Sequence, residues 1–427
     1  FNSLISDWNE EELKQTAATF SIRQPIKWTD GTLELINSLT LQKSYSEFAQ
    51  AVNLPGDVIN IKEQQEDPWR YENDLYLRFT QPLFTYNRTK MRLKELRLDL
   101  ENTLLNYNLQ QLSLEKQITQ EFYNAYLKKM QLQIAIEEMN NRETSYNIIK
   151  NKVDAGLSPM EELYQAELDL STSKSNVQNL EVALQNALDN FKIMVGISLF
   201  EEIDVITDVS KMEVAIDLDR AIEYGVEHRL ELRQREIDIE NSLFELTRTA
   251  AENEFLGNLR LVYGVTGEDG KFRQVYQEPR DNQQVSLSFE IPLFDWGHKK
   301  SLVKAAQATI DSRELTKEET KNNVIYGIRQ AHRAVKNQTS QIVIAEQNVR
   351  NAQLTYDINL ERYKNGDLTS MDLNLFENQL STKKIDYIQA LINYKIALLD
   401  LKIQSLWDFT KNRPVFPENL DRMMDDF

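Results

Sequence analysis

Apolar residues recur at helical spacing along two very long stretches of the chain. Between about residues 84 and 155, and again between about 298 and 365, there is no proline, and Gly327 is the only glycine. Apolar residues in the first stretch are separated by three, four or seven positions: Leu96, Leu100, Leu104, Tyr107, Leu114, Ile118, Phe122 and Ala125. This period predicts an α-helix. At about 1.5 Å per residue, a helix of roughly 67 residues is on the order of 100 Å long, which no compact globular domain requires.

Both long stretches end at a short turn, and a second helix follows each turn. The turn sequences are Asp154-Ala155-Gly156-Leu157-Ser158-Pro159 and Asn365-Gly366-Asp367-Leu368-Thr369-Ser370. The glycine in each turn suits the left-handed position that closes a helix. Ser158 with Glu161, and Thr369 with Asp372, have the spacing of a capping box for the next helix, and Pro159 is tolerated in a first helical turn. We therefore expect an αα-hairpin at each place.

The two returning helices carry a heptad pattern. In the first, gaps of three and four alternate along Leu163, Ala166, Leu170, Ser173, Val177, Leu180, Leu184, Ala187 and Phe191. The second keeps the same phase along Leu373, Phe376, Leu380, Lys383, Tyr387, Ala390, Tyr394, Ala397 and Leu401. A sustained period of about 3.5 residues predicts left-handed coiled-coil packing, so we interpret these positions as structural.

Shorter segments around 75–79, 259–265 and 285–291 alternate apolar and polar residues, which predicts strands. We expect a loop at 264–270, and Asp30-Gly31 between two alternating runs predicts a hairpin turn. Aromatic residues gather at the strand ends: Trp28, Trp69, Tyr71, Phe84, Tyr86, Phe294 and Trp296. This placement favours the interfacial girdle of a membrane barrel, although a sheet packed on a soluble core would show the same alternation.

The two halves of the chain are copies of one unit. Residues 74–84 (DLYLRFTQPLF) resemble residues 284–294 (QVSLSFEIPLF), an offset of 210. The same offset pairs Tyr146 with Tyr356, Gly156 with Gly366, and Glu167, Leu170, Ser171 and Thr172 with Glu377, Leu380, Ser381 and Thr382. One constant offset over this length indicates an internal duplication without net insertions.

Composition narrows the class of protein. The 427 residues include 49 Lys and Arg against 67 Asp and Glu, a formal charge of −18, and no cysteine. The absence of cysteine excludes disulfide scaffolds and thiol metal sites. An acidic chain also lacks the excess of positive charge that nucleic-acid binding requires. No run of about 18 apolar residues occurs, so a membrane-spanning helix is excluded, whereas barrel strands of about 10 residues are not. A few strands per chain cannot close a barrel, so closure would require oligomerisation.

No catalytic motif is present. His228, His298 and His332 are not spaced with carboxylates as a metal box, and the glycines at 264, 267 and 270 are not followed by a helix start as a phosphate loop would be. We expect no enzyme activity, no cofactor and no metal site.

Together these patterns resemble the TolC-type outer-membrane efflux channels. The resemblance covers roughly residues 70 to 410. It rests on FTQPLF at 79–84 and FEIPLF at 289–294, on Arg362-Tyr363-x-x-Gly366-x-x-Thr369-x-x-Asp372 with Glu377 beyond, and on Ala221 followed by His228-Arg229-Leu230-Glu231-Leu232.

The resemblance implies a mainly α-helical fold with a β-barrel part. Three copies would each give four strands to one outer-membrane barrel, and their helices would form a hollow periplasmic tunnel. The implied function is a passive conduit of a tripartite efflux or type I secretion system, gated at its periplasmic tip. The implied partners are a periplasmic adaptor protein, an inner-membrane transporter and outer-membrane lipid. The alternative is a coiled-coil scaffold of the periplasm without a pore.

The resemblance also implies functional residues at the turns. Adaptor docking would use Gly156, Leu157, Ser158, Gly366, Asp367, Leu368 and Thr369. The acidic residues six positions after each turn glycine, Glu162 and Asp372, would form the constriction, and Tyr363 matches a gate tyrosine. The alternatives are carboxylates placed at helix N-termini and a tyrosine in packing. Leu368 and Leu375 stand where the family has a gate arginine and a second acidic residue, so a gate here must use other partners.

We expect five segments along the chain. Residues 1–70 form an N-terminal segment with an extra β-hairpin, 71–200 the first repeat, 201–216 a linker, 217–411 the second repeat and 412–427 a tail. The second repeat begins with a helix expected at about 217 to 257, and the first repeat has no equivalent. We therefore expect its first helix upstream of Phe1, which leaves the strand count open.

Overall fold

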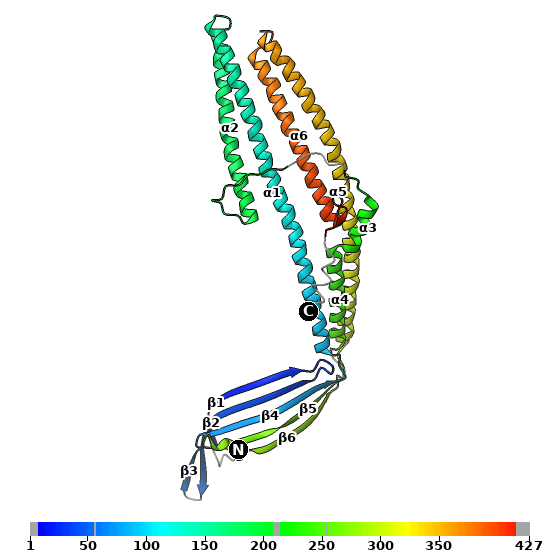
Figure 1. Ribbon diagram of the computed structural model, residues 1–427. Helices are drawn as coiled ribbons and strands as arrows, with labels where there is room; N and C mark the ends of the chain where they lie inside the picture. Colours follow the sequence, from blue (N-terminus) through cyan, green and yellow to red (C-terminus); the bar gives the residue numbers. More distant parts are fainter. Residues whose placement is uncertain (1–6, 55–56, 208–213, 253, 416–427) are drawn as a thin grey trace. The chain divides into compact units, whose positions relative to one another are not determined.

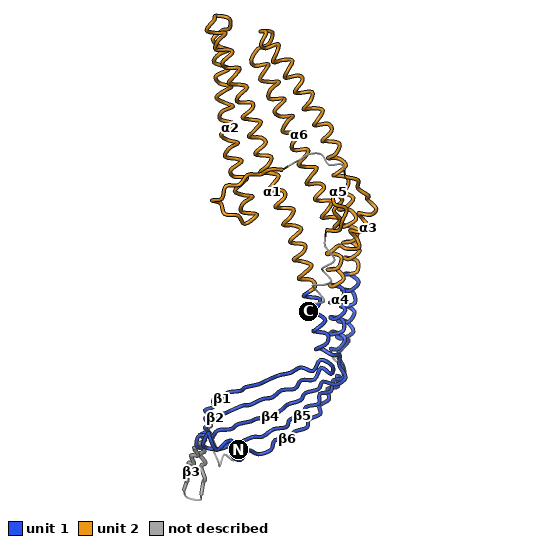
Figure 2. Tube along the Cα trace, viewed as in Figure 1, with its two compact units in different colours: residues 1–100, 238–313 blue, residues 101–237, 314–427 orange. Residues whose placement is uncertain are grey.

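The computed structural model describes residues 7–54, 57–207, 214–252 and 254–415 (Figure 1). The chain divides into two compact units (Figure 2). Residues 1–100 and 238–313 form the first, which holds the sheet, and residues 101–237 and 314–427 form the second, which is helical.

The sheet of the first unit is antiparallel throughout. Its order is β1 (Asp7–Pro25), β2 (Thr32–Leu54), β4 (Arg70–Leu83), β5 (Leu256–Asp269) and β6 (Arg280–Glu290), and β3 (Asp57–Glu66) pairs with the far end of β2. A short 3-10 turn, η1 (Gln274–Tyr276), precedes β6. The three predicted strands are confirmed, and Ile291 lies just beyond β6. The sheet path has one strand more than the four that the resemblance implies, because β1 pairs along the edge of β2.

The predicted loop at 264–270 is wrong, because β5 continues to Asp269. Gly264 lies opposite Tyr76, and a Cβ atom on Gly264 would be 2.3 Å from the carbonyl oxygen of Leu75. Glycine here permits close approach of the neighbouring strand, which is a known role of glycine within strands. From the sequence alone, such a glycine looks the same as a glycine in a loop. At Asp30-Gly31, β1 turns into β2, with Asp30 at φ 62°.

The single helix expected at 217–257 is also wrong. Two helices, α3 (Leu218–His228) and α4 (Leu230–Ala250), meet at Arg229, which has extended backbone angles (φ −68°, ψ 119°). The Arg229 guanidinium donates to the carbonyl oxygens of Ile403 at 2.7 Å and Gln404 at 3.3 Å. These are carbonyls of the last turn of another helix, where a cation is favoured. The break therefore serves a tertiary contact.

Four long helices show the internal duplication. Helices α1 (Arg88–Asp154) and α5 (His298–Lys364) each have 67 residues, and α2 (Met160–Val195) and α6 (Ser370–Ser405) each have 36. In both pairs, the helix of the second repeat begins 210 positions after its equivalent in the first repeat (298 − 88 and 370 − 160). The long helices, the hairpins and the offset predicted from the sequence are thus confirmed. Two short strands, β7 (Trp407–Asp408) and β8 (Arg413–Pro414), follow α6.

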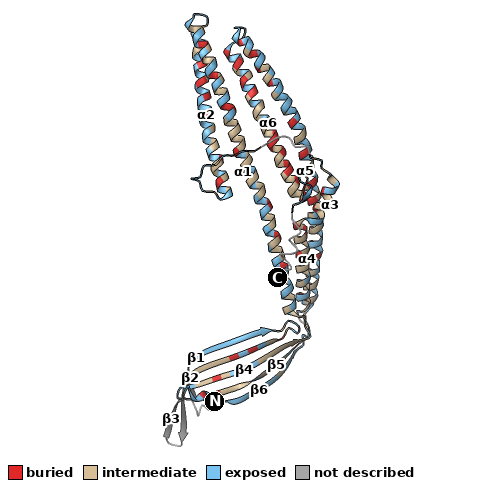
Figure 3. Ribbon diagram, viewed as in Figure 1, coloured by how far each residue is buried: buried red, intermediate tan, exposed pale blue. Residues whose placement is uncertain are grey.

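Buried residues recur at intervals along these helices (Figure 3). Ala166, Leu170, Ser173, Val177 and Ala187 are buried on α2, which confirms its heptad positions as structural. One core cluster joins all four helices near the turns: Ile149, Ala166, Ala352, Tyr356, Tyr363, Leu373 and Leu380. Among the helices that the structure describes, none has a stretch apolar and long enough to cross a membrane.

Candidate functional site

The two hairpin turns have the same backbone geometry. Gly156 (φ 73°) and Gly366 (φ 85°) are left-handed, as predicted. In each turn the glycine N–H donates to the carbonyl three residues back, and the next N–H donates to the carbonyl five residues back, at 2.8 to 3.1 Å. This pair of bonds is a Schellman motif, which satisfies carbonyls that a helix end otherwise leaves without partners.

The helix starts after the turns differ. Thr369 caps α6: its hydroxyl accepts from the Asp372 N–H at 3.2 Å and donates to the Asp372 carboxylate at 2.8 Å, so that capping prediction is confirmed. The capping box predicted for Ser158 is wrong, since the N-cap of α2 is Pro159, without a side-chain bond. Pro159 is the repeat equivalent of Thr369 (369 − 210), and it has no oxygen on its side chain.

The gate candidates lie in unlike surroundings. Asp372 is exposed and held by Thr369 at the first turn of α6. Tyr363 is only 3% exposed, and its hydroxyl has no hydrogen-bond partner among the described residues. Burial first, and the Glu162 carboxylate second, raise the pKa of Tyr363 to about 12. Glu162 and Tyr363 therefore interact electrostatically.

The turns present apolar side chains on the surface. Leu157 is 77% exposed, and Met160, Leu168, Met371 and Leu375 are each more than half exposed. A Cβ atom on either turn glycine would meet nothing within 4 Å. Exposed apolar groups gathered on one end of a structure are typical of a docking surface.

A buried charged cluster lies on α1 and α6 below the turns. The Arg142 guanidinium donates to Glu138 and to Asn378, both at 2.7 Å, and lies 3.9 Å from Glu377. Glu377 is 5% exposed, and burial raises its pKa to about 7 against the attraction of Arg142. The repeat pattern pointed to Glu377 but not to Arg142, because the repeat equivalent of Arg142 is Ala352.

Three further ion pairs join the same two helices. Lys384 binds Glu137 at 2.9 Å, Lys116 binds Asp400 at 2.7 Å, and Lys402 binds Glu115 at 2.7 Å. We call this contact between α1 and α6, with the Arg142 cluster and these three pairs, the repeat seam. It links the first repeat to the second within one chain.

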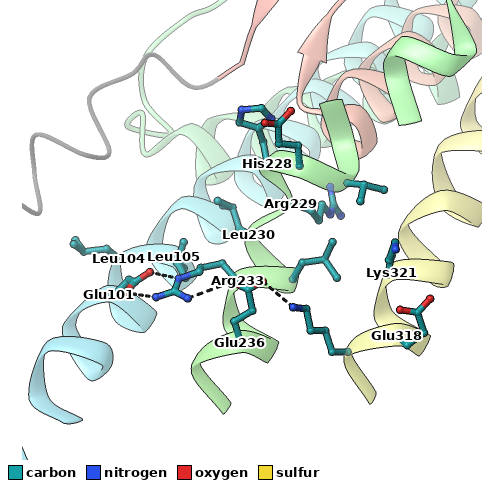
Figure 4. Close-up of a pocket in the computed structure, with 14 residues that line it drawn as sticks. Glu101, Leu104, Leu105, His228, Arg229, Leu230, Arg233, Glu236, Glu318 and Lys321 are labelled. Atoms are coloured by element: carbon teal, nitrogen blue, oxygen red, sulfur yellow. Dashed lines mark hydrogen bonds and ion pairs between the residues drawn. The ribbon is translucent and has the colours of Figure 1, made fainter. Parts of the chain in front are cut away.

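A cleft of about 720 Å³ opens where α1, α4 and α5 meet (Figure 4). Arg233 lies between Glu101 (3.0 Å) and Glu236 (3.2 Å), and Lys317 binds Glu236 at 2.9 Å. The hydrogen bond from Lys317 is the main reason that the pKa of Glu236 is lowered. These charges bind one another across three helices, so the cleft is lined by a structural network.

The class of protein follows from the sequence family to which the chain belongs, and the fold agrees with it. Residues 38–196 and 226–403 match the family described as outer membrane efflux protein. The chain belongs to this family. It is an outer-membrane efflux channel of the TolC type, lying in the outer membrane and extending into the periplasm, and the scaffold alternative is not supported.

Solved channel structures share the fold. The Campylobacter jejuni CmeC outer membrane channel has a TM-score of 0.70 and 14% identity, covering 98% of this chain and 81% of that one. The Vibrio cholerae outer membrane protein VceC has a TM-score of 0.67 and 13% identity, covering 92% and 87%. The open state of the Neisseria gonorrhoeae MtrE channel has 0.66 and 14%, covering 92% and 80%. No curated protein sequence matches the chain significantly.

Proposed function

We propose that three copies of this chain assemble into one passive conduit that is gated at the hairpin turns. The observation that carries this proposal is the pair of equal helical hairpins, with matching turns, in a chain of a channel family. Within the described residues, β1 and β6 end the path of the sheet. An open sheet edge calls for a partner, and neighbouring copies supply one by closing a shared barrel.

We assign the gate to Asp372, Glu162 and Tyr363. Three copies of Asp372 around a narrow axis would place like charges close together, which attracts cations. The exposure of Asp372 and its fixed position beside Thr369 support this role. Glu162 would join Asp372 in the constriction and act together with Tyr363, since its carboxylate contributes to the raised pKa of that tyrosine.

We assign adaptor docking to the turn residues Gly156, Leu157, Ser158, Gly366, Asp367, Leu368 and Thr369. The exposed Leu157 and the neighbouring Met371 support this surface, because apolar side chains on a helical hairpin suit the helical tip of a partner. Leu368 packs against the buried cluster, so it would support the turn from inside. An inner-membrane transporter would supply energy and select the cargo.

Conductance in planar bilayers tests the conduit. Purified protein in detergent should have the mass of a trimer and should insert to give uniform single-channel steps. A protein that stays in solution without detergent and passes no current would contradict the proposal.

A further inference from the structure

One face of the sheet carries exposed apolar side chains on four successive strands of its path. Ile22 of β1 lies opposite Leu35 of β2, Leu35 lies opposite Leu77 of β4, and Leu77 lies opposite Tyr263 of β5. These four residues are 40 to 68% exposed. Residues opposite each other in an antiparallel pair share a face, so the apolar face is continuous from β1 to β5. In an outer-membrane barrel, apolar side chains point to lipid and polar ones point inward.

The opposite face of the sheet is polar, and β1 contributes to it. The Glu34 carboxylate on β2 pairs with Arg23 of β1 and lies 3.4 Å from the guanidinium of Arg78 on β4. Glu34 is only 7% exposed. Further along the same face, the hydroxyl groups of Thr19 and Ser38 are 3.2 Å apart. The strand β1 therefore has one apolar and one polar face, as its neighbours do.

The turn after β1 is fixed to the start of α1. The Asp30 carboxylate accepts from the backbone N–H and from the hydroxyl of Thr89, both at 2.7 Å. The Asn87 side chain donates to the Lys27 carbonyl at 2.9 Å. A carboxylate that accepts from a free N–H in the first turn of a helix acts as a cap. This cap holds the end of β1 beside the end of β4, the strand that leads into the helix.

The paired part of β1 has the length of a membrane strand. The strand β4 pairs with β2 over Thr32–Gln42, and the residues of β1 opposite this stretch are Gln15–Pro25, which is eleven residues (25 − 15 + 1). A tilted strand crosses a bilayer in about 9 to 11 residues. In length, in its two faces and in its fixed end, β1 resembles the strands that follow it.

We propose that β1 is a membrane-spanning strand of the barrel wall, with Phe20 and Ile22 against the acyl chains of outer-membrane lipid. This inference rests on the proposed trimer and specifies its wall. Lipid is the partner because the apolar face continues from β1 onto β2, β4 and β5 in a chain that lies in the outer membrane.

A fifth strand enlarges the barrel. Each copy then gives at least five strands to the wall, and three copies give at least 15 (3 × 5), where the family resemblance implies 12 (3 × 4). Because the diameter of a barrel grows roughly linearly with the number of strands, the passage is wider by about a quarter.

A wall of four strands per copy would require β1 to leave. In that arrangement β6 of the next copy pairs with the edge of β2, but β1 occupies this edge along its whole length, Asp7–Pro25. Its departure would break the ion pair between Arg23 and Glu34. With β1 in place, the next copy meets β1 instead. Each strand of the path is antiparallel to the next, so β1 and β6 run in the same direction and direct pairing between them is parallel.

Quenching by lipid tests the position of β1, because the chain has no cysteine of its own. The single variants Phe20→Cys and Ile22→Cys, labelled with a bimane fluorophore, are reconstituted as trimers in phosphatidylcholine vesicles with nitroxide-labelled acyl chains. Both should lose as much fluorescence as Leu77→Cys on β4. The control is Ser21→Cys, which lies between them on the polar face. Its label should resist the lipid quencher and should be quenched by iodide in water.

The outcomes separate this inference from the proposed function. Quenching at Leu77→Cys without quenching at Phe20→Cys and Ile22→Cys would overturn the fifth strand and leave the conduit standing. Equal quenching at Ser21→Cys and Ile22→Cys would do the same, because β1 would then lie in lipid outside the wall. A protein whose Leu77→Cys label also escapes the lipid quencher, and which passes no current, would overturn both.

A disulfide across the two strands tests whether β1 stays in place in the assembled channel. Thr19 and Ser38 lie opposite each other, so Thr19→Cys with Ser38→Cys should oxidise within one chain. The oxidised protein should still form trimers with the conductance of the reduced protein. The control is Ala18→Cys with Ser38→Cys, whose thiols should stay free because successive strand residues point to opposite faces. Free thiols in assembled trimers of the Thr19 pair, or trimers that form only after reduction, would overturn the proposal.

Discussion

At the scale of the residue, the duplication has placed one residue type in two environments. Glu167 and Glu377 are equivalent, but Glu377 is buried beside Arg142 while Glu167 faces solvent. Burial of a carboxylate opposes its charged form, and an arginine at 3.9 Å only partly offsets that cost. The local sequence is alike around both residues, so the difference arises from the helix that covers Glu377.

Glu377→Gln should change how stability depends on pH. Because the pKa of Glu377 rises from 4.5 to about 7, the folded chain holds a proton between these pH values that the unfolded chain has lost. Acidification from pH 8 to pH 5 should therefore stabilise the protein through this group, by at most about 3 kcal/mol.

Glutamine mimics the protonated form of Glu377, so the Glu377→Gln variant should be more stable than the parent at pH 8 and should lose this pH dependence. Thermal unfolding across pH 5 to 8 measures it, and Glu167→Gln is the control. If the stability of Glu377→Gln still changed with pH as in the parent, the Glu377 carboxylate would not be the group responsible.

Tyr363→Phe separates packing from gating. The hydroxyl of Tyr363 lacks a partner among the described residues, so its removal should leave the unfolding temperature unchanged or raise it, an effect of about 0 to 1 kcal/mol. A gate role adds a second expectation, a higher open probability in bilayer recordings. Tyr356→Phe is the matched control, being a buried tyrosine on the same helix further from the turn. Unchanged gating in Tyr363→Phe would show that the tyrosine serves packing alone.

At the scale of the element, the sequence predicted those features that depend on hydrophobic period and on the residues of a single turn. The two 67-residue helices, the heptad positions of α2 and the left-handed glycines follow from residues close in the chain. The break at Arg229 does not, because it depends on carbonyls of Ile403 and Gln404 that lie far away in sequence. The ion pairs of the repeat seam were missed for the same reason.

Gly366→Ala should destabilise the turn through its backbone alone. A Cβ atom there would touch nothing within 4 Å, so no steric clash contributes, whereas φ of 85° is costly for alanine. The expected loss is about 1 kcal/mol. Thermal unfolding of the detergent-solubilised protein measures it, with Asn365→Ala, the exposed preceding residue, as control. Equal unfolding temperatures for the two variants would contradict the role of the left-handed position.

At the scale of the whole molecule, the acidic composition acquires a meaning beyond solubility. The proposed trimer carries a formal charge of −54 (3 × −18). Charge of one sign along a water-filled passage concentrates cations near the walls and disfavours anions. The excess of acidic residues, which first argued only against nucleic-acid binding, then contributes to the selectivity of the conduit.

Asp372→Asn should weaken block of the channel by trivalent cations added on the side of the turns. Three carboxylates converging on the axis would bind such an ion, and three amides would not. Single-channel recordings measure the blocking concentration, which should rise at least tenfold. Asp367→Asn is the control, because Asp367 lies in the turn outside the proposed ring. Unchanged block in Asp372→Asn would remove it from the constriction.

The equal lengths of the paired helices restrict how this protein can evolve. Both hairpins consist of one helix of 67 residues and one helix of 36 residues. The ion pairs of the repeat seam join residues of one hairpin to residues of the other. Deleting seven residues from α1 alone would move every pair on one side of the deletion by a heptad relative to α6. Insertions and deletions are therefore tolerated only when they occur together in both halves of the gene. Homologous channels with shorter or longer tunnels should differ by matched changes in α1 and in the part of α6 that pairs with it.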